Sequence, residues 1–99
     1  MSDIVVISEN SYSGGSGSMK YTFTSDYKRC VLIANAAHNN SDVSVSVSIS
    51  CVYNLIKNKS FTSYSSPTKL QVYELTDVKQ GDTVQISYNP ALYYIIFTI

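Results

Sequence analysis

The sequence carries little charge and no net charge. Only 14% of its 99 residues are charged, and seven basic residues balance seven acidic ones. Nucleic-acid-binding proteins usually show a basic patch. The nearest approach to one here, the lysines at 57, 59 and 69, is more typical of a solvated loop edge. We therefore expect no nucleic-acid partner. A neutral domain with nine tyrosines is prone to self-association, so we expect a homo-oligomer or a place in a larger assembly.

Long hydrophobic runs are also absent. The longest apolar block, residues 91–97, is about a third of the length that a membrane-spanning helix needs. The first eight residues lack the basic segment and the long apolar stretch of a signal peptide. We therefore expect no membrane partner and no signal peptide, and a protein that is made in a cytoplasm and stays soluble.

Residues arranged for catalysis or metal binding are scarce. Cys30 and Cys51 lie in strand-like runs with no partner at metal-ligand spacing, so we expect buried free thiols, with a disulfide as the alternative. His38 is the only histidine, and no Gly-x-Ser-x-Gly motif occurs. Asp77 and Asp82 bracket a turn, where capping of backbone amides is favoured over calcium binding. We predict no catalytic residue, no metal and no cofactor, and no enzyme activity.

An alternating segment decides the fold class. From residue 43 to residue 51, apolar and serine residues alternate without a break, so that Val43, Val45, Val47, Ile49 and Cys51 share one face. A helix would scatter these apolar residues around its axis. The segment therefore predicts a β-strand with one dry and one wet face, in a sheet packed on a core.

Other strand-like segments follow at short intervals. We predict strands over residues 3–8, 20–24, 29–35, 70–75, 83–88 and 92–99, with turns at 25–28, 38–42, 57–60 and 79–82 and a loop at 63–68. The 29–35 run is apolar on both faces, which is typical of an interior strand. The whole is an all-β domain: an antiparallel β-sandwich, of jelly-roll or immunoglobulin-like type, with about seven to eight short strands.

A glycine- and serine-rich stretch at residues 13–18 divides the sequence. Its composition is flexible, and it is a long loop, a linker or an engineered insertion. We therefore divide the chain into an N-terminal strand with this stretch, residues 1–18, and a β-sandwich domain, residues 19–99.

Tyrosine is the one enriched residue type suited to binding, because its ring is rigid and apolar and its tip is polar. There are nine tyrosines and no tryptophan. Those in or beside predicted loops form the candidate exposed aromatic patch: Tyr12, Tyr27, Tyr53 and Tyr64. The alternative is that these tyrosines serve the strands, which use this residue widely.

The C-terminal strand is apolar on both faces. In a two-sheet sandwich only one face of a strand meets the core, so the other face requires a loop, the N-terminal segment or another subunit. One face carries Leu92, Tyr94 and Ile96, and the other carries Tyr93, Ile95 and Phe97. We expect the second set at an oligomer interface, because phenylalanine and tyrosine are enriched in the cores of interfaces.

Four segments together resemble a known class of module. Residues 21–28 (Tyr-Thr-Phe-Thr-Ser-Asp-Tyr-Lys), 31–33, 75–84 (with Val-Lys-Gln-Gly-Asp-Thr-Val) and 93–97 follow one another in the order seen in small β-sandwich modules. Such modules occur in tail-fibre, baseplate and other virion surface proteins of bacteriophages and prophages of Gram-positive bacteria. The resemblance spans residues 21–99. It departs from the class in one respect, since those modules usually end long fibrous proteins.

The resemblance implies a non-enzymatic structural or adhesive protein of the virion: an appendage, a decoration or a receptor-binding module. It implies a homotrimer, with other virion proteins or a bacterial surface glycan as partners, located in the virion or, when newly made, in the host cytoplasm. The alternative is a soluble phage-encoded inhibitor that captures a host defence protein or a small nucleotide. A lysine- or arginine-lined pocket at a subunit interface would favour the inhibitor.

Overall fold

The computed structural model describes residues 4–37, 43–63 and 66–99. These residues form eight β-strands: β1 (Val5–Tyr12), β2 (Gly17–Thr22), β3 (Tyr27–Ala37), β4 (Ser44–Ile49), β5 (Val52–Ser63), β6 (Ser66–Val78), β7 (Thr83–Asn89) and β8 (Leu92–Thr98). The predicted all-β class is confirmed. The predicted turn at 38–42, with His38, lies outside the described residues.

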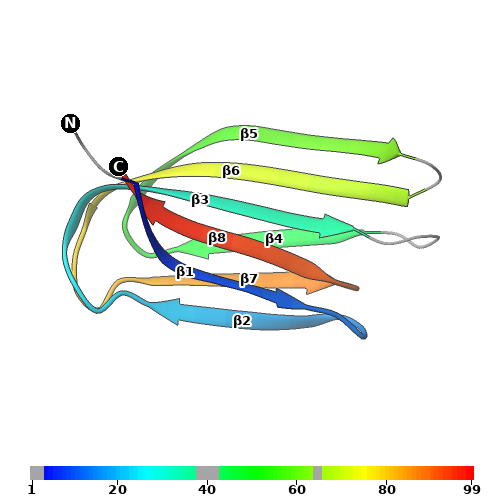
Figure 1. The fold of residues 1–99 in the computed structure, drawn as a ribbon, viewed down its shortest axis with the longest axis horizontal. Helices are drawn as coiled ribbons and strands as arrows, with labels where there is room; N and C mark the ends of the chain where they lie inside the picture. The colour runs from blue at the N-terminus through cyan, green and yellow to red at the C-terminus, as the bar shows by residue number, and fades with distance from the viewer. Residues whose placement is uncertain (1–3, 38–42, 64–65) are drawn as a thin grey trace.

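The strands form two antiparallel sheets that pack face to face (Figure 1). The order is β1-β8-β3-β6-β5 in the five-stranded sheet and β2-β7-β4 in the three-stranded sheet. A jelly roll has the connectivity of one long hairpin folded over itself. Such folding pairs β1 with β8, β2 with β7 and β3 with β6, as observed here. Of the two expected types of sandwich, the jelly-roll order is the one observed.

β5 departs from this scheme. A regular jelly roll would pair β5 with β4, but β5 instead forms a hairpin with β6 along one margin of the five-stranded sheet, with a register shift between Leu55 and Lys57 (Figure 1). The prediction of a turn at 57–60 is therefore wrong, and β6 begins within the predicted 63–68 loop. The polar Lys-Asn-Lys-Ser run resembles a turn, but an exposed edge strand also takes lysine and other polar residues.

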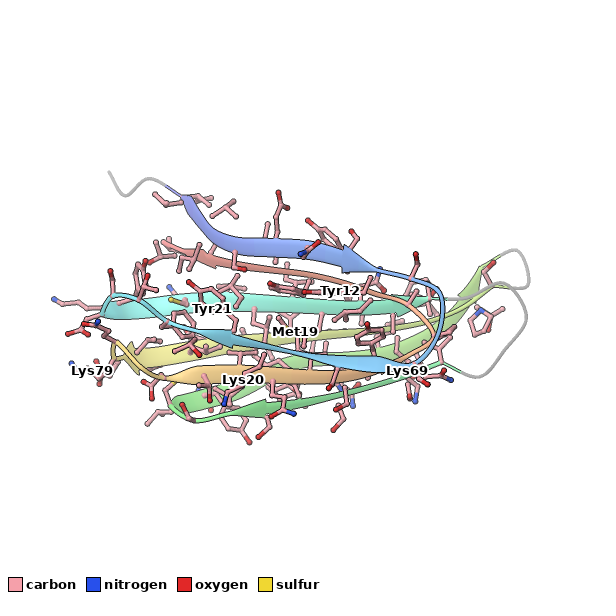
Figure 2. All side chains as sticks on the ribbon, turned by 90° about the horizontal axis from the view of Figure 1, so that it is seen from below. Tyr12, Met19, Lys20, Tyr21, Lys69 and Lys79 are labelled. Carbon is pink, nitrogen blue, oxygen red and sulfur yellow. The ribbon has the colours of Figure 1, made fainter. Side chains whose placement is uncertain are left out.

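The core lies between the sheets. Cys30, Leu32, Ala34 and Ala36 of β3 alternate inward and are buried, and residues of β6, β7 and β8 meet them. β3 is the central strand of its sheet, so the prediction of an interior strand at 29–35 is confirmed. Across the core, Figure 2 shows Met19 on the side of β2 that faces the five-stranded sheet and Lys20 on the opposite side.

The alternating Val/Ser segment forms β4 with the predicted faces. Its serines are exposed, Val43 is buried, and Val45, Val47 and Ile49 pack against the core while remaining half-buried. The incomplete burial has a simple cause. β4 is an edge strand of the smaller sheet, so solvent reaches its apolar face from one side.

The N-terminal segment belongs to the sandwich. β1 pairs with β8 from Val5 to Tyr12, and β2 already begins at Gly17, inside the stretch that the sequence suggested as a linker. The N-terminal strand of the expected division at residue 18 thus pairs within the same sandwich. Gly17 has a packing reason, because a Cβ atom there would lie 2.9 Å from the Tyr88 hydroxyl oxygen. The glycine-rich stretch carries the chain from one sheet to the other.

Acidic residues hold the turns at one end of the sandwich. The backbone amide of Lys79 donates to Asp82 Oδ2 at 2.8 Å, and the Ser50 hydroxyl donates to Asp82 Oδ1 at 2.9 Å. The amide of Gln80 donates to Asp26 Oδ1 at 2.8 Å. The predicted capping role is thus observed for Asp82, and Asp26 caps a turn in the same way; both carboxylates join turns that are distant in sequence.

Candidate functional site

The tyrosines predicted as one exposed patch are placed on separate parts of the fold. Tyr12 is half-buried between the sheets, with its ring centroid 5.8 Å from that of Tyr88 and 6.4 Å from that of Tyr94 (Figure 2). Tyr27 is also half-buried, packed edge-on against Phe23. The expected exposure of these two is wrong, because their rings fill the ends of the core.

The other two tyrosines differ. Tyr53 is exposed on β5 and packs edge-on against Tyr73, with 5.8 Å between ring centroids. Tyr64 lies outside the described residues. Tyr12 and Tyr27 lie at opposite ends of the five-stranded sheet by its strand register, so the structure does not bring these residues together. Binding by Tyr53 or Tyr64 stays a prediction.

A hollow lies at the far end of the β5–β6 hairpin. It has a volume of about 420 Å³ and is lined by Val43, by Ser60, Phe61 and Thr62 of β5, and by Pro67, Thr68 and Lys69 of β6. Hydroxyl groups and one lysine could hold a small anionic group there. The volume falls in the range of small-molecule sites, although the lining offers only one cationic side chain.

The most extensive feature is the face of the five-stranded sheet that points away from the three-stranded sheet, here called the outer face. Its centre consists of the half-buried or exposed side chains of three neighbouring strands: Val31, Ile33 and Asn35 of β3, Leu70 and Val72 of β6, and Tyr93, Ile95 and Phe97 of β8. No described element covers these side chains. Except for Asn35, they are apolar or aromatic.

The C-terminal strand contributes to both sides of the sheet. Leu92, Tyr94 and Ile96 are buried in the core, whereas Tyr93, Ile95 and Phe97 lie on the outer face. Of the two sets considered for an interface, the structure leaves the favoured one uncovered. Its role in an oligomer stays a prediction.

Sequence reasoning missed the contribution of β3 and β6 to this surface. The signal was present in the 29–35 run, whose second apolar set includes Val31 and Ile33. It pointed to an interior strand, but it could not say that one of the strand's two faces would meet solvent.

Charged groups stand around the apolar centre of the outer face. On the β1 side, the Tyr93 hydroxyl donates to Glu9 Oε2 at 2.8 Å, and this hydrogen bond is the main cause that raises the pKa of Tyr93. On β3 and β6, Arg29 pairs with Glu74. On the β5 side, Lys57 and Lys59 are exposed. The outer face is therefore acidic at the β1 margin, basic at the β5 margin, and apolar between them apart from the Arg29–Glu74 pair.

The two cysteines are free thiols directed toward the core. Burial raises the pKa of Cys30 from 9.0 to about 11, and the nearby Cys51 adds to this shift. Burial also raises the pKa of Cys51, with a further contribution from Asp82. Since the thiolate is the reactive form, both thiols are poor nucleophiles at neutral pH, in line with a packing role.

The raised pKa of Cys30 predicts that the protein loses stability at alkaline pH. Above pH 9 the unfolded thiol loses its proton while the folded thiol keeps it, so stability falls between pH 9 and about 11. The loss that belongs to Cys30 is on the order of 2 kcal/mol. In urea unfolding at pH 8, 9 and 10, the free energy of unfolding should fall more steeply with pH for the wild type than for Cys30→Ala. This holds whatever the difference in stability between the two proteins at pH 8. Equal slopes would contradict the assignment.

Over the described parts of the chain, no group of three or more His, Cys, Asp or Glu residues is arranged to hold a metal ion. The same residues include no helix long and apolar enough to cross a membrane.

Comparison of the chain with models of known protein families, with curated proteins and with solved structures finds no match.

Proposed function

We propose that this protein is a non-enzymatic structural or adhesive β-sandwich of a bacteriophage or prophage virion: an appendage, decoration or receptor-binding module. It works by assembling through its outer face. The observation that carries the proposal is the apolar centre of that face, which extends over β3, β6 and β8. Soluble monomers rarely expose a contiguous apolar patch of this kind, and larger patches mark interaction sites.

The fold supports this role. A sandwich in jelly-roll order recurs in viral capsid proteins, although a fold by itself does not determine function. The resemblance of residues 21–99 to phage surface modules points the same way. In this proposal the outer face holds the protein in an assembly, and the margin that carries Tyr53 is available for a bacterial surface glycan or another virion protein.

The test is to follow the protein through density-gradient purification of phage particles from an induced or infected culture. We expect it to be enriched with the particle band in a fixed ratio to a major virion protein, measured by quantitative mass spectrometry. A tagged Phe97→Glu variant should be lost from the band, while a Gln85→Glu variant, altered on the exposed side of the three-stranded sheet, should be retained. Recovery of the wild-type protein only from the soluble lysate would refute the virion role.

The second candidate is a soluble inhibitor that captures a small nucleotide or a host defence protein. It is favoured by one observation, the hollow of about 420 Å³ in which Lys69 lies beside serine and threonine hydroxyls. Thermal melts in the presence of mononucleotides and of cyclic dinucleotides test this second candidate. Stabilisation that is lost in Lys69→Gln but kept in Lys59→Gln supports the inhibitor. Unchanged melting with every nucleotide counts against nucleotide capture.

A further inference from the structure

The strand register sorts the side chains of the outer face into rows that cross all five strands. The middle row reads, from β1 to β5, Glu9, Ile95, Ile33, Val72 and Lys57. It begins with an acid, ends with a base and has three aliphatic residues between. The middle member, Ile33, belongs to β3, the central strand of the sheet.

This order of residues is complementary to itself. In a two-fold symmetric contact, residue i of one copy meets residue j of the other, and j meets i. A two-fold axis running along β3 would lay the row over a reversed copy of itself. Glu9 would then face Lys57 of the second copy, Ile95 would face its Val72, and Ile33 would lie near the axis.

Other arrangements lose this match. A two-fold axis across the strands would place β1 over β1 and β5 over β5, so that like charges would share each margin. Aligned sheets pack about 10 Å apart, with strand directions within about 30° of each other. At that spacing the long side chains of Glu9 and Lys57 can reach one another at the margins.

The neighbouring row supplies an independent observation. It contains Asn35 at its centre, between Tyr93 and Leu70. The Asn35 side-chain oxygen is buried and has no hydrogen-bond partner among the described residues. Asn35 is on the same strand and face as Ile33, so the axis along β3 brings two copies of Asn35 toward each other. The Asn35 oxygen is closed off within one copy, so the two Asn35 amides can hydrogen-bond across the axis once each side chain rotates toward the contact.

We propose that the outer face binds the outer face of a second copy of this chain, about a two-fold axis along β3, with Glu9 and Lys57 pairing reciprocally across the contact. This inference deepens the proposed function and rests on its use of the outer face for assembly. It replaces the trimer that the phage resemblance implies with a dimer, because a two-fold contact through this face closes at two copies.

A charge exchange tests the arrangement. The expected wild-type state in sedimentation velocity at low ionic strength is a dimer. Glu9→Lys and Lys57→Glu should each raise the dimer dissociation constant about tenfold, because each change creates two like-charge contacts per dimer. The double variant Glu9→Lys/Lys57→Glu should return to within about threefold of the wild-type value. Both changes are at exposed positions, and circular dichroism checks that all three variants keep the fold.

The matched control is Glu9→Lys combined with Lys59→Glu. Lys59 is in the neighbouring row, so in the two-fold contact it would face Ser11 of the second copy rather than Glu9. This combination of changes should therefore not restore the dimer. A trimeric mass, single variants without effect, or a double variant that is not restored would each overturn the two-fold arrangement. Those results would leave the virion role standing, since that role is decided by the particle fractionation.

Discussion

Leu32→Asp should abolish the cooperative fold, whereas Ile33→Asp, one residue further along the same strand, should leave it intact. Leu32 is fully buried at the centre of the five-stranded sheet and faces the three-stranded sheet. A carboxylate there would be buried without a partner, at a cost of several kcal/mol. That cost is comparable with the 5–15 kcal/mol by which domains are typically stable.

The two variants should separate clearly in thermal melts followed by circular dichroism. Leu32→Asp should show no cooperative transition, and the milder Leu32→Ala should lose about 2–5 kcal/mol. Ile33 points to the outer face, where its side chain is only half-buried, so Ile33→Asp should melt cooperatively. A stable Leu32→Asp protein would mean that the two faces of β3 are assigned the wrong way round.

Phe97→Glu should convert an assembled wild-type protein into folded monomers. The Phe97 ring lies on the outer face in the same row as Val6 and Val31, and the buried centres of interfaces depend on such aromatic residues. A glutamate in this position would have to be desolvated in every copy that joins the contact. We expect the dissociation constant to rise by at least about a hundredfold.

Light scattering of the wild type, Phe97→Glu and Gln85→Glu over a concentration series measures this effect. Gln85→Glu adds the same charge on the exposed side of β7 and should assemble as the wild type does. A wild-type protein that stays monomeric at high micromolar concentration would remove the basis for assembly through the outer face. An oligomer that survives Phe97→Glu would place the contact elsewhere, with the exposed edge of β5 as the next surface to examine.

Much of the local structure could be predicted from the sequence because side chains alternate with period two along a strand. Val45, Val47 and Ile49 lie on the predicted face of β4, and the inward and outward sets of β8 separate as the pattern indicates. The doubly apolar 29–35 run correctly predicted the central position of β3. The prediction failed where composition alone was the guide, because the polar 57–60 segment belongs to a strand. Of the alternatives for the glycine-rich stretch, a loop is the one observed.

Only part of the outer face could be predicted from the sequence. The sequence identified Tyr93, Ile95 and Phe97 as one face of a strand, since that requires only local periodicity. It could not add Val31, Ile33 and Val72 to the same surface, because strand order is decided by contacts between residues far apart in the chain. For the same reason it grouped Tyr12 with Tyr27, which the fold places at opposite ends.

The sequence by itself therefore determined the fold class and which side chains share a face of each strand, because both follow from the backbone's own repeat. Only the tertiary structure decided which of those faces would be covered. The three-stranded sheet covers one side of β3 and β8, and no described element covers the other. Strand order likewise decided that Glu9 and Lys57, from β1 and β5, end the same row. Local periodicity carries no information about neighbours across a sheet, and the outer face is built from such neighbours.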